Sequence, residues 1–597
     1  MSTPPLRRLL PFAAALAITA YGAILRVDAL VEKYGFVDRP VWARLVTHAG
    51  GPAGAALRPF ALGWPPIAHP YVGGDPINYL KYGREMRSFY QGHVREPIFL
   101  ALTRVCLWLL SNQDIAVSFA SLAGSVLAIV ATFLLGSALI GPAGGLLAAL
   151  VMAIERENIT WAPDGWRDDT FTASVVFAAW AFVRFRARPS WANAILLGAT
   201  SAAACLTRIT AISFVLPGLL WLAIDAPRGQ RRALLRPLAL AAFTAAALVT
   251  PYLVNCARTL GDPLIAVNYH TGYYRFSEGL PSQQPMPATQ YVREKLARSP
   301  LTTIDTGMIG VFVEPFRTKW SGLDYTSRAL RVVLYWSAIA GLLMLPFVAA
   351  GRLMLVILLT SLVPYAFTWN IGGGGEWRFT MHAYPFYIVA ASYALVWLAR
   401  AVVGAWRRRS LPDGTRMRTV LVRTFAMIAI ALLATVAYLV MPWFVFGEVL
   451  ARGEDLTVGT GPRDVAFFRR DWSPPHTEGL ATIRVSLTER AAVWIPLPAR
   501  RSYDAVLRFD PVAPDVQHRV TVLLNRQVIA RLDLSWDPQR VGSYRVHLPE
   551  QYVRPGANEL VLVPDSLVPA SAAGPRFAWV GPEARLGVRL WLVRVLP

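Results

Sequence analysis

Long apolar segments alternate with short loops over the first three quarters of the chain. The first run covers about residues 9–25, and the forty-residue run 115–154 is interrupted at Gly141-Pro142. Because about 20 apolar residues cross the hydrocarbon core of a bilayer, such runs indicate membrane-spanning helices. A cleaved signal peptide begins in a similar way, but the length of the first run and the many runs that follow favour a retained span. The pattern predicts eleven spans, at 9–25, 115–154 (two), 170–183, 192–224 (two), 233–254, 330–350, 352–369, 380–399 and 421–443.

The segment 97–110, PIFLALTRVCLWLL, is apolar but short, and it contains Arg104. We interpret it as an interfacial or re-entrant helix, because fourteen residues do not comfortably cross a bilayer. With the N-terminus inside and eleven spans, three arginine-rich loops lie on the inner side, as the positive-inside rule requires. A twelfth span at 97–110 would move all three outside. The inner loops are then 184–190, 226–237 and 400–424, and the outer segments are 26–95, 155–169, 256–328 and the C-terminus.

From about residue 457 the pattern changes to short stretches in which apolar and polar residues alternate. HRVTVLLNRQVIARLDLSW alternates on both sides of a predicted turn at Asn525-Arg526, and SYRVHLP, NELVLVP and LGVRLWLVRVL are typical of further strands. Pro and Gly separate these stretches, which indicates a β-sandwich or jelly roll. The sequence therefore predicts a polytopic α-helical membrane domain over residues 1–445 and an extracytoplasmic β-sandwich domain over residues 457–597.

Composition supports this division and narrows the classes of partner. Hydrophobic residues make up 55% of the 597 residues and charged residues only 16%, which is too apolar for an ordinary soluble protein. The net charge of +22 fits arginines retained in cytoplasmic loops, and it also fits binding of anionic membrane lipids. Nucleic-acid binding is not expected, because the basic residues are scattered among apolar spans. The cysteines Cys106, Cys205 and Cys256 have no spacing that indicates a disulfide framework or a metal motif.

The stretch GGDPINYLKYGREM, residues 73–86, gathers charges and aromatic rings in the first outer segment. An Asp on the outer face, above membrane helices, can act as a general base, so Asp75 is the first candidate for chemistry. Asp-Pro is also a common helix start, and Asp75 has a second interpretation as a capping acid.

The acidic loop 155–169 ends in Asp168 and Asp169, at the mouth of the next predicted span. Acids are favoured at a helix N-terminus, which is one interpretation of the pair. The other is a second carboxylate that orients an acceptor or binds a cation such as Mg²⁺ or Mn²⁺. The sequence leaves open which of the two acids takes that role and whether a metal is needed.

Two arginines lie near membrane depth, where charged side chains are costly and usually functional. Arg208 stands between two short spans, and Arg378 follows the four glycines of GGGGEWRFTMHAYP. Arginine is suited to bidentate contacts with phosphate, so both are candidates for binding a phosphate group. The alternative for each is a side chain that reaches back to the membrane interface.

The order of these features resembles that of GT-C membrane glycosyltransferases, in the branch that includes protein O-mannosyltransferases and lipid A aminoarabinose transferases. GGDPINYLKYGREMRSFYQGHVREPIF resembles the first outer loop of that family, in which Asp75 matches the catalytic Asp, Tyr79 a Tyr, and Arg84-Glu85-Met86 the following helix. Arg95-Glu96-Pro97 resembles its charged-Pro segment, WRDDTFTASVVF its second outer loop, and LTRITAISFVLP the segment with its basic residue, here Arg208. Pro76 and Glu96 depart from the pattern, because the family usually has Glu after the Asp and Lys beside the Pro. The resemblance covers roughly residues 8–445.

Such a resemblance implies transfer of a sugar from a polyprenyl-phosphate carrier to a glycan, lipid or protein acceptor on the outer face, with no required cofactor. A single displacement with one carboxylate as base would invert the anomeric carbon. The richness in Ala, Arg, Leu and Pro is that of a GC-rich bacterium, so we expect the inner (cytoplasmic) membrane with the site on the periplasmic or extracellular side. The candidate site residues are Asp75, Asp168 and Asp169 as catalytic acids, Arg84, Arg95, Arg208 and Arg378 as ligands of the donor phosphate, and Tyr79, Trp166 and Glu376 as sugar or acceptor contacts.

Two other classes of protein are weighed against this hypothesis. A transporter or lipid flippase with an appended β domain predicts paired inverted halves, and the sequence has no such symmetry. A non-catalytic glycan-binding scaffold is the third class. The β domain itself is interpreted either as a carbohydrate-binding module or as a structural cap, and its candidate sugar platforms are Trp494, Tyr503, Trp536, Tyr544 and Trp579.

Overall fold

A computed structural model of the chain forms two compact units. One comprises Met1–Glu294 with Gly310–Arg416, and the other comprises Lys295–Ile309 with Met417–Pro597. The structure describes residues 5–33, 74–110, 112–226, 229, 231–277, 284–305, 307, 310–312, 316, 320, 328–368, 377–408, 414–459, 462–478, 481–534 and 541–597.

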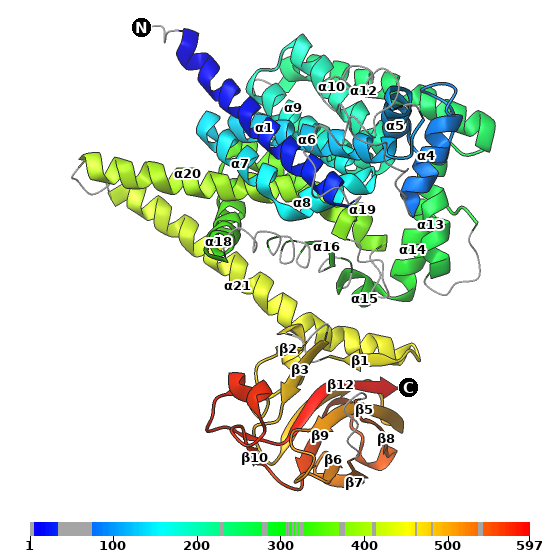
Figure 1. Cartoon of the computed structure of the whole chain (residues 1–597), viewed down its shortest axis with the longest axis vertical. Coiled ribbons are helices and arrows are strands. Elements are labelled where there is room, and N and C mark those ends of the chain that lie inside the picture. Colours follow the sequence, from blue (N-terminus) through cyan, green and yellow to red (C-terminus); the bar gives the residue numbers. More distant parts are fainter. Residues whose placement is uncertain are drawn as a thin grey trace, which may run out of the picture. The chain divides into compact units, whose positions relative to one another are not determined.

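Every predicted span falls on a helix of the structure (Figure 1). Within the described ranges, six helices are long and apolar enough to cross a membrane by length and composition, namely α1, α6, α12, α18, α19 and α20. The other predicted spans lie on α7, α9, α10, α11 and α21. The helices at the predicted spans are α1 (Pro5–Lys33), α6 (Ala116–Ile140), α7 (Pro142–Ile154), α9 (Asp168–Ala187), α10 (Trp191–Thr207), α11 (Ile212–Ile224), α12 (Arg231–Leu260), α18 (Arg328–Met344), α19 (Ala349–Thr368), α20 (Tyr384–Arg408) and α21 (Gly414–Ala451).

Short helices connect these long ones. The segment expected as an interfacial or re-entrant helix is α5 (Pro97–Leu109), and Asp75 begins α4 (Asp75–Glu85). The forty-residue apolar run divides where the sequence predicts, because α6 ends at Ile140 and Pro142 begins α7. The remaining short helices are α8 (Arg156–Trp161), η2 (Ala162–Asp164), η3 (Ile209–Ala211), α13 (Ile265–Ser277), α14 (Ala288–Arg298), α15 (Pro300–Ile304), α16 (Gly310–Phe312), η6 (Leu345–Phe347) and η7 (Trp377–Ala383).

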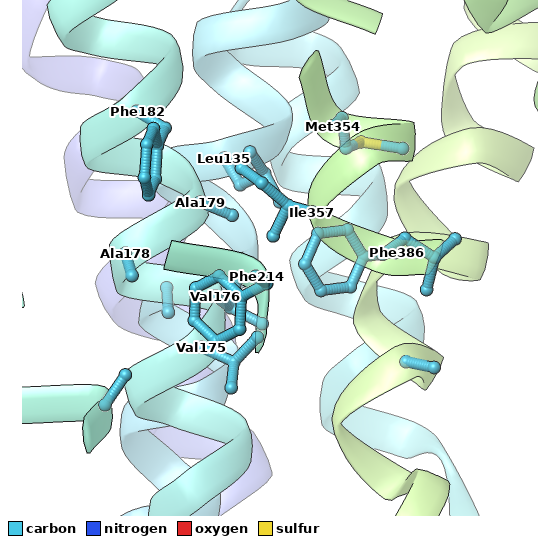
Figure 2. Close-up of a cluster of buried hydrophobic side chains, with 14 of the residues drawn as sticks. Leu135, Val175, Val176, Ala178, Ala179, Phe182, Phe214, Met354, Ile357 and Phe386 are labelled. Atoms are coloured by element: carbon cyan, nitrogen blue, oxygen red, sulfur yellow. The ribbon is translucent and has the colours of Figure 1, made fainter. Parts of the chain in front are cut away.

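The core of the first unit is built around α9, which packs against α6 and α10. Small residues such as Ala178 and Ala179 let neighbouring helices approach, and Phe182, Phe214 and Phe386 fill the space between them (Figure 2). All of these side chains are almost fully buried. Tight packing of small and aromatic residues is how helices associate where lipid offers no hydrophobic drive, so this core holds α9 and its N-terminal acids in place.

The described C-terminal strands form two large antiparallel sheets, as the alternating pattern predicts, and a separate two-stranded sheet of β10 and β11. One sheet has the order β2-β3-β12-β5-β8, with β1 also paired to β12, and the other has the order β4-β9-β6-β7. The predicted turn is a two-residue hairpin loop between β6 and β7, in which Asn525 and Arg526 have positive φ angles of 49° and 75°. The strands are β1 (Leu456–Val458), β2 (His476–Glu478), β3 (Ala481–Val485), β4 (Ala491–Leu497), β5 (Tyr503–Pro511), β6 (Arg519–Leu524), β7 (Gln527–Asp533), β8 (Ser543–Leu548), β9 (Gly556–Pro564), β10 (Val568–Pro569), β11 (Arg585–Leu586) and β12 (Val588–Leu596), with the short helices η8 (Pro462–Phe467), η9 (Glu550–Tyr552) and η10 (Pro575–Val580) between them.

Alternate residues of these strands meet in one hydrophobic core between the sheets. Val493 on β4 and Leu560 on β9 belong to the same buried cluster as Leu507 on β5 and Leu590 on β12. The two sheets thus form a sandwich. Phe446 of α21 joins this cluster as well, so the end of that helix belongs to the core of the second unit.

Candidate active site

The first part of the candidate site is the start of α4. Gly74 precedes the helix with a φ of +71°, a conformation that favours glycine, and Pro76 occupies the first turn, where its missing N–H costs nothing. Asp75 lies where the positive end of the helix dipole favours an acid. About a third of its side chain (34%) is exposed. The N-cap of α4 is Gly74 and Asp75 is the first residue of the helix, so Asp75 is not the capping residue, and its carboxylate remains partly accessible.

Asp75 faces a nearly buried arginine. Its Oδ1 lies 3.8 Å from Nη2 of Arg95, of whose side chain 10% is exposed. The guanidinium of Arg95 also lies 5.6 Å from the ring centroid of Tyr79 and contacts Nε2 of His270 on α13. Tyr79 is buried, and its ring packs edge-on against Phe99. Asp75, Tyr79 and Arg95, three of the predicted site residues, thus form one cluster, and His270 joins it.

The first and second predicted outer segments meet beside Asp75. A Cβ on Gly74 would lie 3.5 Å from Cη2 of Trp166, and one on Gly165 would lie 3.2 Å from Cβ of Pro76. Trp166 is therefore a direct neighbour of the turn that holds Asp75. Pro76, which departs from the family pattern, fills this contact.

Glu96, the other departure from the pattern, links three parts of the chain. Its side chain is 2% exposed and forms an ion pair with Arg167, directly before α9. Its Oε1 also accepts a hydrogen bond of 2.8 Å from the backbone N–H of Ile209, in the turn after α10. An acid here can make both contacts, whereas a lysine would repel Arg167. Glu96 therefore anchors the turn that carries Arg95.

Asp168 forms a second buried ion pair. Its Oδ1 accepts a hydrogen bond of 2.7 Å from Nη2 of Arg208, and the two side chains are 4% and 6% exposed. Nη1 of Arg208 donates to the hydroxyl of Tyr365 over 3.1 Å, and the guanidinium lies 5.1 Å from the ring centroid of Phe171. Arg208 is thus held inside the bundle by an acid and by aromatic rings.

The side chain of Asp169 does not share the surroundings of Asp168. It is 1% exposed, and its Oδ2 accepts a hydrogen bond of 3.0 Å from the hydroxyl of Ser121 on α6. Its Oδ1 has no hydrogen-bond partner among the described residues. Asp168 lies beside Arg208, whereas Asp169 lies between α6 and α9, so the two neighbouring acids have different surroundings.

A third acid of this loop, Glu155, is also fully buried. It accepts hydrogen bonds from the backbone N–H groups of Glu157 and Asn158 at the start of α8. Burial raises the pKa of Glu155 to about 7, although these hydrogen bonds oppose the shift. Within the described residues, no group of three or more His, Cys, Asp or Glu is arranged to hold a metal ion.

The other predicted site residues lie apart from this cluster or outside the described residues. Arg84 is at the opposite end of α4 from Asp75, where its Nη2 lies 2.6 Å from Oδ1 of Asp114. The backbone of Arg378 belongs to η7, and Glu376 lies outside the described residues.

Two polar residues with partners in distant segments were not predicted from the sequence, the buried Arg26 and the half-buried His270. Arg26 near the end of α1 donates to the carbonyls of Met152 and Ala153, in the last turn of α7. An arginine at the edge of an apolar run is a signal that could have found it. His270 has no such signal, because only the fold brings α13 to Arg95.

Of the five candidate sugar platforms in the β domain, Trp494, Tyr544 and Trp579 are partly exposed. Trp494 lies on β4, opposite Glu559 of β9, and Arg469 lies 4.4 Å from its ring centroid. Tyr503 is buried in the sandwich core, Tyr544 packs on Phe509 of that core, and Trp579 stacks on His476. Trp536 lies outside the described residues.

Residues 94–254 match the family model described as dolichyl-phosphate-mannose-protein mannosyltransferase. The match confirms, over these residues, the resemblance to GT-C membrane glycosyltransferases that the sequence motifs indicate. It contains Arg95, Asp168 and Arg208, and it begins after Asp75. No curated protein matches the chain.

Solved structures similar to this chain include three membrane glycosyltransferases. The oligosaccharyltransferase of Archaeoglobus fulgidus, in complex with Zn and sulfate, is 14% identical with a TM-score of 0.38, and the match covers 73% of this chain and 53% of that one. ArnT from Cupriavidus metallidurans bound to undecaprenyl phosphate is 16% identical with a TM-score of 0.37, and the match covers 64% of this chain and 71% of that one. The arabinosyltransferase EmbB from Mycobacterium smegmatis is 11% identical with a TM-score of 0.23, and the match covers 100% of this chain and 65% of that one. The chain spans about half the length of the archaeal oligosaccharyltransferase.

Proposed function

We propose that this chain is an integral membrane glycosyltransferase that moves a sugar from a polyprenyl-phosphate-linked donor to an acceptor hydroxyl. The observation that carries the proposal is the pairing of a partly exposed carboxylate, Asp75, with the nearly buried guanidinium of Arg95. The family model over residues 94–254 supports the same donor class, because its description names a sugar carried on dolichyl phosphate, a polyprenyl phosphate.

In this proposal Asp75 is the general base. One carboxylate oxygen accepts the proton of the acceptor hydroxyl as that oxygen attacks the anomeric carbon of the donor. The bond between the anomeric carbon and the phosphate oxygen breaks, and its electron pair leaves with the polyprenyl phosphate. A single displacement of this kind inverts the anomeric carbon. A carboxylate at the partly solvated start of a helix is available for this task, and general-base catalysis typically contributes about 10²- to 10⁴-fold in rate.

Arg95 takes the role of a phosphate ligand. The leaving phosphate gains negative charge as the glycosidic bond breaks, and a nearly desolvated guanidinium stabilises that charge more strongly than one in water would. The ring of Tyr79 and the imidazole of His270 hold Arg95 in place, so the cation need not reorganise during the reaction. Trp166, whose ring lies beside Gly74, is positioned to contact the sugar or the acceptor.

Asp168 and Arg208 act as positioning residues in this proposal. Their ion pair ties the start of α9 to the turn after α10, and the pair of Glu96 and Arg167 ties the same start to the turn that carries Arg95. Catalysis by preorganised charge depends on such fixed surroundings. A direct phosphate contact from Arg208 or Arg378 remains a prediction from the sequence. Arg84 lies at the end of α4 opposite Asp75 and is not part of this proposal.

We place the reaction on the outer face of the bacterial inner (cytoplasmic) membrane, where the positive-inside rule puts residues 26–95 and 155–169. The β-sandwich belongs to the same side by that rule. We propose that it binds a glycan acceptor through Trp494, since a partly exposed indole beside charged side chains is a suitable platform for a sugar ring.

Replacement of Asp75 tests the proposed function. In purified full-length protein, Asp75→Asn is expected to reduce transfer from a radiolabelled polyprenyl-phosphate sugar by about 10³-fold, because the amide cannot accept the proton. Glu85→Gln, an exposed acid on the same helix, is the matched control and should leave transfer unchanged. Wild-type transfer by Asp75→Asn would exclude Asp75 as the base. Absence of transfer by wild-type protein, together with movement of intact lipid across proteoliposomes, would favour a flippase instead.

A further inference from the structure

A pocket lies between α4 and α5, at the end of α4 that is farthest from Asp75. Its volume is about 660 Å³, within the range of small-molecule and cofactor sites. Helices α4 and α5 pack against each other, as Figure 1 shows. The residues that line this α4–α5 pocket are Gly83, Arg84, Met86, Arg87, Ser88, Phe89, Ala101, Arg104, Val105, Leu107, Trp108 and Asn112.

The lining is strongly basic. It includes Arg84, Arg87 and Arg104 and contains no Asp or Glu. Two of these guanidiniums are fixed in place: Arg84 pairs with Asp114 at the edge of the pocket, and Arg104 donates to the carbonyls of Gly83 and Arg84 at the end of α4. Arg87 is exposed. Three arginines against two neighbouring acids, Asp114 and Glu85, leave an excess of positive charge that suits a phosphate group.

One wall of the pocket is apolar and open. Ala101, Val105 and Trp108 are spaced at i, i+4 and i+7 along α5, which places them on one face of the helix, beside Arg104. Trp108 is 69% exposed and Val105 is 51% exposed, and Phe89 on the opposite side is 39% exposed. Large exposed apolar side chains next to arginines are typical of the region where a protein meets lipid headgroups.

We infer that the α4–α5 pocket binds the phosphate headgroup of an anionic phospholipid, with the first methylenes of its acyl chains against Val105 and Trp108. Basic pockets beside membrane helices bind anionic headgroups through this combination of charge and apolar contact. The apolar wall favours a lipid over a soluble anion, because inorganic phosphate would leave Trp108 and Val105 exposed to water.

This site is separate from the proposed donor site. Asp75 and Arg84 are nine residues apart on α4, which corresponds to about 14 Å along a helix. The bound phospholipid therefore holds α4 and α5 at the membrane interface and does not take part in the transfer. The inference does not depend on the proposed function.

Native mass spectrometry of the full-length protein with added phosphatidylglycerol tests the inference. Arg87→Gln removes one charge from the pocket, and the apparent Kd of the first phosphatidylglycerol adduct is expected to rise about fivefold, since each basic residue near an anionic headgroup contributes on the order of 1 kcal/mol. Arg87→Lys retains the charge and should restore affinity. Arg87→Gln combined with Trp108→Ala should weaken binding further. Thermal unfolding of each variant, measured without added lipid, shows whether the variant is folded.

Lys81→Gln is the matched control, because Lys81 is an exposed cation of α4 that does not line the pocket. It should change the Kd less than twofold. Equal weakening by Lys81→Gln and Arg87→Gln would overturn the inference, since binding would then reflect surface charge alone. Unchanged binding in Arg87→Gln would overturn it as well.

Competition identifies the source of the phosphate group. Phosphatidylcholine and inorganic phosphate are not expected to displace the first phosphatidylglycerol adduct. Displacement by inorganic phosphate would show a soluble-anion site and would contradict the inference. Displacement by undecaprenyl phosphate below the concentration at which phosphatidylglycerol binds would assign the pocket to the donor and would contradict it too.

Discussion

Two acids of the candidate site, Asp75 and Asp168, have opposite surroundings. Oδ1 of Asp75 lies 3.8 Å from Arg95 with 34% of its side chain exposed, whereas Oδ1 of Asp168 lies 2.7 Å from Arg208 with 4% of its side chain exposed. Each acid begins a helix and each faces an arginine. Burial and distance, rather than residue type, therefore distinguish the partly exposed carboxylate of Asp75 from that of Asp168, which is engaged in an internal ion pair.

The largest effect on stability is expected for Asp168→Asn. This change leaves the buried guanidinium of Arg208 without its counter-charge, which typically costs about 3–5 kcal/mol. Thermal unfolding of the purified protein in detergent should show a lower midpoint. The double variant Asp168→Asn with Arg208→Met should recover part of the loss, because it removes the unpaired charge. If Asp168→Asn unfolds at the same temperature as the wild type, the ion pair with Arg208 contributes no more to stability than a solvent-exposed pair would.

The buried carboxyl of Glu155, in the loop 155–169, is expected to make the stability of the protein depend on pH. Its pKa is about 7 in the folded protein and near the ordinary 4.5 when unfolded, so the folded state binds the proton more tightly. Proton binding by Glu155 therefore stabilises the folded state. This stabilisation is complete below pH 4.5 and is lost as the pH rises through 7, by an amount on the order of 3 kcal/mol. Glu155→Gln should remove this pH dependence between pH 5 and 8. An equal slope in both proteins would show that other groups cause it.

A small effect on stability is expected for Asp75→Asn, although the proposed function predicts a large loss of transfer activity. The contact with Arg95 is long and partly solvated, and such pairs contribute roughly 0–1 kcal/mol. The unfolding midpoint should therefore stay close to that of the wild type. If the unfolding midpoint of Asp75→Asn fell as far as that of Asp168→Asn, Asp75 would stabilise the fold as strongly as Asp168 does. The proposed difference between the two acids would then be wrong.

A similarly small effect is expected for Asp164→Asn, in the same loop as Asp168. Asp164 pairs with Lys33, and the two side chains are 21% and 37% exposed. Solvent screens such a pair, so we expect a change within about 0.5 kcal/mol in thermal unfolding. A larger loss would indicate that position in this loop matters more than burial.

Much of the fold could be predicted from periodicity. The apolar runs located the helices from α1 to α21, and Gly141-Pro142 marked the break between α6 and α7. The alternation of apolar residues and the Asn525-Arg526 turn located the hairpin of β6 and β7. These features are local, because helix and strand periods and turn chemistry depend on residues close together in the chain.

The candidate site could be predicted only in part. Asp75, Tyr79 and Arg95 were identified by type and order, and the structure brings them together. The sequence could not decide between Asp168 and Asp169, since a helix turns about 100° per residue and neighbouring side chains face different elements. Nor could it show that His270, from a distant helix, contacts Arg95.

The sequence by itself determined the membrane class of the protein, the positions of its helices, the β-sandwich and the candidate acids of the site. These follow from hydrophobicity, period and residue type. Only the tertiary structure decided which carboxylate is buried against a counter-charge and which is partly exposed. Glu96 illustrates the reason: its role as an anchor depends on Arg167 and on the backbone N–H of Ile209, both far away in the chain. Burial and charge pairing are properties of the packed protein, because they depend on what distant segments bring to the same place.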